Sequence, residues 1–219
     1  MVSVICPVWN QRVITHKFLF HHQRLYYRRP DIEFIIVDNG STDNTQTTLN
    51  LWRHQFEDRL KVITLADNTG FGPGHNIGAA AAEGDILIFI SNDVIPFEDY
   101  IKLIEENIKP NTLIGPELIT KDTGWNTFNG VTIPYLAGHL IACDRQTWDT
   151  LGGWDERYVP CDYEDIDLSM MAREKGIKLI EVKLPVHHLF GQSVQTLAGG
   201  RLQITLESQR KFKEKWGYV

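Results

Sequence analysis

Carboxylates crowd one short stretch of the chain, Asp162-Tyr-Glu-Asp-Ile-Asp-Leu-Ser-Met-Met-Ala-Arg-Glu-Lys-Gly176. Four acids occupy its first six positions, and apolar residues then recur four apart, which is the spacing of an α-helix. We predict Asp162 as the N-cap of this helix and Gly176 as the residue that ends it. Acids in a first turn suit the helix dipole, so a capped helix start is one interpretation. Capping needs only one or two acids, and the surplus indicates a further role.

Another carboxylate, Asp93, follows an apolar segment directly, in Ile90-Ser-Asn-Asp93. A carboxylate in this position suits a hard cation that keeps water ligands and bridges phosphate oxygens, and an Asx turn is the alternative. Two adjacent histidines, His187 and His188, follow the end of a later predicted strand. Neighbouring side chains of a strand point to opposite faces, so at most one imidazole would reach such a metal. A purely structural histidine is the alternative.

The glycines at positions 70, 72, 74 and 78 do not form the pattern G-x-G-x-x-G, and the chain has no Walker lysine. It also lacks the nucleophile-elbow pattern G-x-S-x-G. These absences disfavour a dinucleotide fold, a P-loop and a serine hydrolase. A backbone cradle for a nucleotide stays open.

Strands and helices alternate through the first ninety residues. Apolar segments predict strands at 2–8, 34–37, 60–65 and 85–90, and helical spacing predicts helices at 15–28, 43–56 and 79–83. This order is typical of a mostly parallel sheet, in which ligands bind beyond the carboxyl ends of the strands. The four ends are polar, so the topology predicts a site at 7–10, 38–41, 66–68 and 91–93.

The second half of the chain is less regular. We expect a loop or β-hairpin insertion over the site at 117–134 and a turn at Gly152-Gly-Trp-Asp155. Helices are predicted at 145–151 and 202–216, a strand at 177–182, and irregular structure at 185–193.

Size and composition predict one α/β domain. The chain has 219 residues, 42% of them hydrophobic, and a formal net charge of −6, which does not favour nucleic acid. The first predicted helix has a basic face, formed by Lys17, Arg24, Arg28 and Arg29. We interpret this face as solvated surface, and a binding patch is the alternative.

Three cysteines without a CxxC pair indicate reduced thiols and a cytoplasmic protein. No apolar run is long enough to span a membrane, and the N-terminus lacks the charged region of a signal peptide. Any membrane contact is therefore expected to be peripheral, at the inner membrane face.

Several segments in order resemble family 2 glycosyltransferases with the GT-A fold, and the rhamnosyltransferase-like branch is the most similar in character. They are Val2 to Asn10, Phe34-Ile-Ile-Val-Asp-Asn-Gly-Ser-Thr-Asp43, Asn68-Thr-Gly-Phe-Gly-Pro-Gly-His-Asn-Ile-Gly78, Ile86-Leu-Ile-Phe-Ile-Ser-Asn-Asp93, Leu151-Gly-Gly-Trp-Asp-Glu156, Tyr163-Glu-Asp-Ile-Asp-Leu168 and His188-Leu-Phe-Gly-Gln-Ser193. Together they cover nearly the whole chain. The resemblance implies one Rossmann-like GT-A domain, with a nucleotide-sugar half at 1–93 and an acceptor-binding and catalytic half at 94–219.

The resemblance also implies roles for individual residues. Asp165 matches the catalytic base, with Glu164 beside it, and Asp38 matches the acid that meets the uracil or thymine ring of the donor. Asp93 and His188 match the metal ligands, the cation being Mn²⁺ or Mg²⁺. The other implied donor contacts are Pro7, Asn10, Asn68, Gly70, Asn76, Asn92 and Asp93, and the implied acceptor contacts are Trp154, Asp155 and Glu164.

Three positions depart from the family pattern. Ser91 stands where many relatives carry a first aspartate, so metal binding would depend on one carboxylate and His188. Thr69 and Met171 stand where arginines are frequent, and Arg173 or Arg201 would have to replace them at the diphosphate.

The sequence therefore predicts a metal-dependent inverting glycosyltransferase that uses a UDP- or dTDP-sugar. The acceptor could be a saccharide, a lipid-linked glycan, a small molecule, a protein or a modified nucleic acid. A catalytically silent sugar-nucleotide or glycan-binding module, a sugar nucleotidyltransferase and a nucleic-acid-binding protein are the alternatives. The segment from Cys6 to Arg12 lacks the basic, glycine-rich loop expected of a nucleotidyltransferase.

Overall fold

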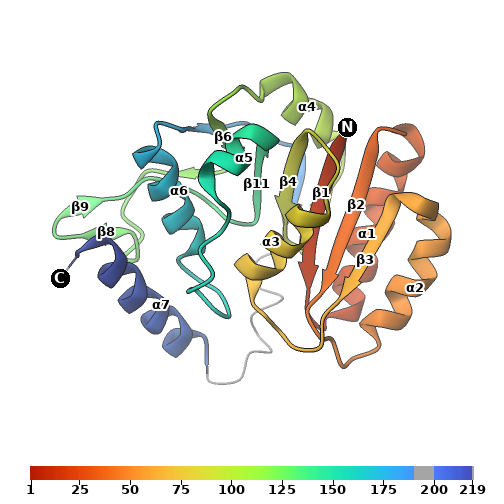
Figure 1. Ribbon diagram of the computed structural model, residues 1–219, viewed down its shortest axis with the longest axis horizontal. Helices are drawn as coiled ribbons and strands as arrows, with labels where there is room; N and C mark the ends of the chain where they lie inside the picture. The colour runs from red at the N-terminus through yellow and green to blue at the C-terminus, as the bar shows by residue number, and fades with distance from the viewer. Residues whose placement is uncertain (190–199, 219) are drawn as a thin grey trace.

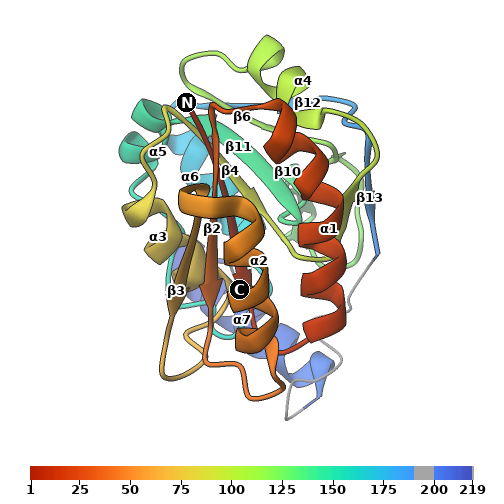
Figure 2. The ribbon, with the colours of Figure 1, turned by 90° about the vertical axis from the view of Figure 1, so that its right-hand side faces the viewer.

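A computed structural model describes residues 1–189 and 200–218 and shows the expected mixed α/β architecture (Figure 1). The central sheet has seven strands in the order β12-β6-β11-β4-β1-β2-β3. Helices cover both faces of this sheet (Figures 1 and 2). The GT-A-like architecture predicted from the sequence is therefore confirmed.

The first half alternates strands and helices as predicted. Its elements are β1 (Val2–Val8), α1 (Arg12–Arg28), β2 (Ile32–Asp38), α2 (Thr45–Phe56), η1 (Glu57–Arg59), β3 (Leu60–Thr64), α3 (Phe71–Ala81) and β4 (Ile86–Ile90). The strand β1 pairs in parallel with both β2 and β4, and β2 pairs in parallel with β3. The carboxyl ends of these four strands therefore meet along one edge of the sheet.

The second half adds three strands to the sheet and builds a layer over that edge. Its elements are β5 (Val94–Pro96), α4 (Tyr100–Asn107), β6 (Thr112–Gly115), β7 (Leu118–Ile119), β8 (Thr127–Phe128), β9 (Val131–Thr132), β10 (Tyr135–Leu136), β11 (Leu140–Asp144), α5 (Arg145–Leu151), α6 (Glu164–Glu174), β12 (Lys178–Glu181), β13 (Val186–His188) and α7 (Arg201–Trp216). The strand β11 is antiparallel to β4, which makes the sheet mixed. The predicted hairpin in the insertion is the pair β8–β9.

Three details of the sequence prediction are wrong. Asp162 does not cap α6: Tyr163 holds the N-cap position with φ 71°, and the Asp162 side chain accepts bonds from Arg201 and Thr205 instead. Residues Val186–His188 form a strand against β5 rather than irregular structure, and positions 190–193 lie outside the described residues. The helix α3 begins at Phe71, eight residues before the predicted 79–83 segment, because its glycines and Pro73 are tolerated near a helix start.

Gly176 follows α6 with φ 71°, as predicted for the residue that ends it.

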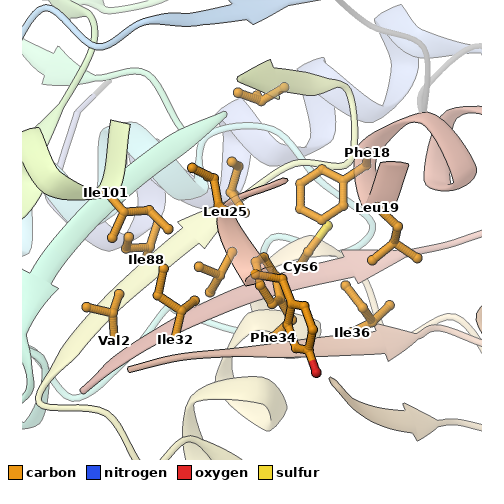
Figure 3. Close-up of a cluster of buried hydrophobic side chains, with 14 of the residues drawn as sticks. Val2, Cys6, Phe18, Leu19, Leu25, Ile32, Phe34, Ile36, Ile88 and Ile101 are labelled. Carbon is orange, nitrogen blue, oxygen red and sulfur yellow. The ribbon is translucent and has the colours of Figure 1, made fainter. Parts of the chain in front are cut away.

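Alternate residues of the strands feed two cores, one on each face of the sheet. Val4 and Cys6 of β1 pack with α1, α2 and α4, whereas Ile5 packs with α3, α5 and α6. Figure 3 shows Phe18 and Leu19 of α1 above this part of the sheet. The buried strands and the helices pressed on them make a rigid base for the polar strand ends.

The closest approach of α3 to the sheet is at Gly78. A Cβ atom on Gly78 would overlap Ile5 Cγ2 and would lie 3.3 Å from Val37 Cγ2. Gly78→Ala should therefore lower the free energy of unfolding by about 1–3 kcal/mol, as overpacking does. Helix propensity alone would raise the free energy of unfolding by about 1 kcal/mol. The sign of the change measured by urea titration therefore shows whether steric overlap or helix propensity dominates. A more stable variant would contradict the tight α3–β1 packing.

Candidate active site

A pocket of about 740 Å³ opens at the carboxyl ends of the parallel strands. One wall comes from the ends of β1, β2 and β4, and the other comes from the β10–β11 connection, the start of α6, β13 and the start of α7. The lining residues that the following description uses are Pro7, Asn39, Asn68, Gly70, Asn92, Asp93, Trp125, Tyr135, Gly138, His139, Asp162, Glu164, Asp165, His188 and Arg201. The location is the one predicted from the topology.

Glu164 and Asp165 both line this pocket at the start of α6. Asp165 is held by two backbone N–H groups: Gly138 donates to Oδ2 at 3.0 Å and Ile166 donates to Oδ1 at 2.8 Å. A Cβ atom on Gly138 would lie 3.0 Å from Asp165 Cβ, so the glycine allows this close approach. Glu164 is 8% exposed, and its Oε2 accepts no hydrogen bond from the described residues.

Burial shapes the protonation of this pair of acids. Burial, with the neighbouring Asp165 charge, raises the pKa of Glu164 well above its usual range. Burial also raises the pKa of Asp165 to about 6, against the opposing effect of the Gly138 and Ile166 N–H groups. Both carboxyl groups therefore hold protons more tightly than exposed acids do, and Asp165, with a pKa of about 6, is ionised at neutral pH with a basicity that suits a general base.

Asp167 is directed away from the pocket into a separate polar network. Its carboxylate accepts bonds from Lys215 Nζ at 2.7 Å, Trp216 Nε1 at 2.7 Å and Tyr158 Oη at 2.9 Å. Lys215 also lies 2.8 Å from Asp155 Oδ2. Asp167 thus ties α6 to α7 and is not in a position to share the role of Asp165.

Asp93 and His188 meet in the pocket wall. His188 Nε2 lies 3.4 Å from the buried Asp93 Oδ1, and the His188 ring stacks on His139 with centroids 4.3 Å apart. His187 points to the opposite side of β13 and does not line this pocket. Of these two histidines, His188 is therefore the one placed where it could share a metal ion with Asp93.

The Asp93–His188 pair fits the implied divalent cation. Adjacent ligands of an octahedral Mg²⁺ lie about 3 Å apart, close to the separation of these two atoms. Within residues 1–189 and 200–218, no cluster of three or more His, Cys, Asp or Glu side chains could hold a metal ion. Such an ion would therefore use phosphate and water oxygens beside these two side chains.

The expected donor contacts differ in their surroundings. Pro7, Asn68, Gly70 and Asn92 line the pocket, and so does Asn39, which the motifs did not single out. Asp38 does not line the pocket and is fully buried at the end of β2, with Oδ1 accepting from Ser41 N at 3.0 Å. Asp38 Oδ2 accepts no hydrogen bond from the described residues. Asn10 does not line the pocket but holds the loop after β2, accepting from Thr42 N at 2.8 Å.

The structure does not bring Asn76, Trp154 and Asp155 into the pocket. Asn76 bonds both backbone groups of Trp154, at 2.9 Å each. The Trp154 ring is buried and stacks on His75, and Asp155 binds Arg157 and Lys215. These three residues fix the turn after α5 against α3.

Three lining residues would have been hard to find from the sequence. His139 and Tyr135 lie in a segment without periodicity, and Trp125 lies in the insertion. Arg201 is the one Lys or Arg among the described lining residues, and its Nη2 lies 2.7 Å from Asp162 Oδ1. Arg173 does not line the pocket, so of the two predicted replacements for the missing arginines only Arg201 is there.

Comparison with known proteins identifies the family. The profile of glycosyl transferase family 2 matches residues 3–148, which is more than half of the chain. The chain belongs to glycosyl transferase family 2. The family predicted from the motifs is thereby confirmed.

Individual family members are distant. The "Probable glycosyltransferase YdaM" of Bacillus subtilis is 27% identical over 80% of this chain and 47% of its own length. The "Poly(ribitol-phosphate) beta-N-acetylglucosaminyltransferase TarS" of Staphylococcus aureus is 32% identical over 45% of this chain and 16% of its own length. The chain therefore spans less than half the length of these relatives.

Solved structures share the fold. A mannosyltransferase of Pyrobaculum calidifontis in complex with GDP-Man and Mn²⁺ has a TM-score of 0.65 at 20% identity and covers 83% of this chain and 54% of its own. The structure of S. aureus TarS 1-349 with UDP-GlcNAc has a TM-score of 0.66 at 18% identity, covering 90% and 61%. GalNAc-T7 with UDP, GalNAc and Mn²⁺ has a TM-score of 0.70 at 16% identity, covering 98% and 47%. Among the described residues of this family 2 chain, no helix has the length and apolar character needed to cross a membrane.

The bond network around Asp167 should make Lys215 important for stability. Lys215→Met removes the cation from two acids, one of them fully buried, and should lower the free energy of unfolding by about 2–4 kcal/mol. Lys213→Met on the same helix is the matched control and should change it by less than about 0.5 kcal/mol. Urea titrations measure both. Equal effects of the two substitutions would contradict the proposed tie between α6 and α7.

Proposed function

We propose that this chain is a metal-dependent inverting glycosyltransferase that uses a UDP- or dTDP-sugar. The observation that carries the proposal is the presence, in one pocket at the strand ends, of the Asp165 carboxylate and the Asp93–His188 pair. A general base and a pair of metal ligands are the two parts that a metal-assisted inverting transfer from a nucleoside diphosphate sugar uses. The similar structures that hold UDP, UDP-GlcNAc or GDP-Man, two of them with Mn²⁺, support this choice of donor class and cation.

The donor would lie over the ends of β1, β2 and β4. Asp38 would accept a hydrogen bond from the imide N–H of uracil or thymine, which would satisfy its unpaired Oδ2. Asp93 and His188 would hold the divalent cation, which when bound neutralises the charge that develops on the leaving diphosphate. Arg201 would contact the diphosphate in place of the arginines that Thr69 and Met171 replace.

The acceptor would enter beside α6. Asp165 would take the proton from the acceptor hydroxyl as its oxygen attacks the anomeric carbon from the face opposite the leaving group. The bonds from Gly138 and Ile166 keep the carboxylate in one orientation while each oxygen retains a lone pair. Glu164, whose Oε2 accepts no hydrogen bond from the described residues, would orient the acceptor through that oxygen.

Asp165→Asn tests the reaction directly. The amide keeps the shape and removes the basicity, so turnover should fall by about 10²–10⁴-fold while donor affinity stays nearly unchanged. In the wild type, kcat/KM should decrease as the pH falls through about 6, because Asp165 must be deprotonated to act. This acid limb should be absent in Asp165→Asn and present in Glu164→Gln.

Turnover, donor affinity and melting temperature are measured on the same proteins. A variant Asp165→Asn that melts early but turns over normally would show that the acidic cluster only shapes the start of the helix. An acid limb that persists in this variant would assign the pH dependence to another group.

The metal assignment is tested by binding of the ion itself. Mn²⁺ titrated calorimetrically in the presence of UDP should bind His188→Ala at least tenfold more weakly than the wild type, because one ligand is lost. The neighbouring His187→Ala is the matched control and should bind Mn²⁺ normally. Chelator should abolish transfer, and Mn²⁺ or Mg²⁺ should restore it. Full activity in chelator, or equal loss in both variants, would contradict the assignment.

A further inference from the structure

The outer helices α1 and α2 carry cations and no acids. Their 29 residues contain no Asp or Glu, in a chain that holds 28 acids and a net charge of −6. The cations of α1 are Arg12, Lys17, Arg24 and Arg28, all of them exposed. Figure 2 shows these two helices side by side on the outside of the molecule. These two helices thus carry a net positive charge on the outside of an acidic protein.

A line of exposed apolar side chains runs along the outer side of α1. Val13, Phe20 and Tyr27 are 57%, 57% and 62% exposed. Seven residues of an α-helix turn through about 700°, only about 20° short of two full turns, so these three side chains lie on one line. The opposite side of α1, with Phe18, Leu19 and Leu25, is buried against the sheet. The helix is therefore apolar on two sides, and among residues 1–189 and 200–218 only the inner side is packed against other elements.

Neighbouring elements extend this surface. Leu51 of α2 is 67% exposed, and Phe97, directly after β5, is 61% exposed. His16 joins α1 to α2 by accepting a hydrogen bond from Trp52 Nε1 at 3.2 Å. We call the surface formed by Val13, Phe20, Tyr27, Leu51 and Phe97 with the four cations of α1 the α1 face.

The α1 face includes a hollow between α1 and β5 of about 790 Å³, lined in part by Lys17, Phe20, Arg24 and Phe97. Two acids, Glu98 and Asp99, also line it. Asp99 caps α4 by accepting from Lys102 N and lies 3.6 Å from Arg29, so its charge is balanced locally. The hollow therefore keeps a positive character beside exposed aromatic rings.

The α1 face adjoins the wall of the active site. In β13, His188 lines the catalytic pocket and the adjacent His187 lines the hollow of the α1 face. The strand β13 thus separates the catalytic pocket from the hollow of the α1 face. A surface on which the α1 face docked would lie close to the catalytic pocket.

We propose that the α1 face docks this protein on an anionic lipid bilayer. Exposed cations interleaved with aromatic and aliphatic side chains are the pattern by which a helix lies at a membrane interface, its cations attracting acidic headgroups. Five large apolar side chains exposed together on one surface mark an interaction site. A second copy of the chain fits poorly, because a twofold interface would place this basic surface against itself. The aliphatic side chains of Val13 and Leu51 favour a lipid surface over a nucleic acid, because they cannot stack on bases as Phe20, Tyr27 and Phe97 can.

Sedimentation with vesicles tests this proposal. The full chain should bind vesicles of phosphatidylcholine with about one third phosphatidylglycerol, should bind pure phosphatidylcholine weakly, and should be released by salt. Replacing Lys17, Arg24 and Arg28 together by Gln should lower the partition coefficient on the order of 10²-fold. The matched control replaces the exposed Lys102, Lys109 and Lys121 by Gln and should bind like the wild type. The double variant Phe20→Ser and Phe97→Ser should lower binding even at low salt.

The alternative partners are outcomes of the same experiment. Circular dichroism and melting temperature show that each variant is folded. Failure of the wild type to bind acidic vesicles at low salt, or equal loss in the control variant, would overturn the proposal. A dimer in light scattering that the Phe20→Ser and Phe97→Ser variant disrupts would assign the α1 face to a second copy. Tight binding of a single-stranded oligonucleotide without vesicle binding would assign it to nucleic acid.

Discussion

Four carboxylates lie within six residues at the start of α6, and the fold gives each of them different surroundings. Asp162 binds Arg201 and Thr205, Asp165 accepts two backbone N–H groups, and Asp167 binds Lys215, Tyr158 and Trp216. Glu164 Oε2 accepts no hydrogen bond from the described residues, and burial raises the pKa of Glu164. Because like charges this close repel each other, the separation of their partners allows one of them, Asp165, to stay ionised in a buried pocket.

The helix α7 supplies most of those partners. Arg201 and Thr205 at its start bind Asp162, and Lys215 and Trp216 at its end bind Asp167. The sheet supplies the opposite wall, because the parallel pairing of β1 with β2 and β4 aligns their polar ends along one edge. The first half therefore presents polar strand ends on one side of the pocket, and the second half places Asp165, an acid of raised pKa, on the other side.

The sequence was a good guide where the signal is local. Runs of β-branched residues located the strands, and polar residues after them located the pocket. The direction of a side chain and its distant partners were beyond that reasoning. The family motif placed Asn76, Trp154 and Asp155 at the substrates, yet their bonds hold a turn together. The local pattern suggested Asp162 as an N-cap. Its actual partner, Arg201, lies 39 positions away in the sequence, where a local pattern cannot reveal it. His139 reaches the pocket through long-range contacts, because its carbonyl accepts from Ser91 N and its ring stacks on His188.

The most direct test of the central claim is the melting temperature with a panel of nucleotide sugars, each with and without Mn²⁺. A donor that binds the folded state raises the melting temperature by mass action, by about 5–10 °C at a hundredfold excess over Kd. We expect a UDP- or dTDP-sugar to give this shift, with Mn²⁺ increasing it, and Asp38→Ala to reduce it. Equal shifts with GDP-sugars, shifts that do not depend on Mn²⁺, or no shift with any member of the panel would contradict a metal-assisted donor site at these strand ends.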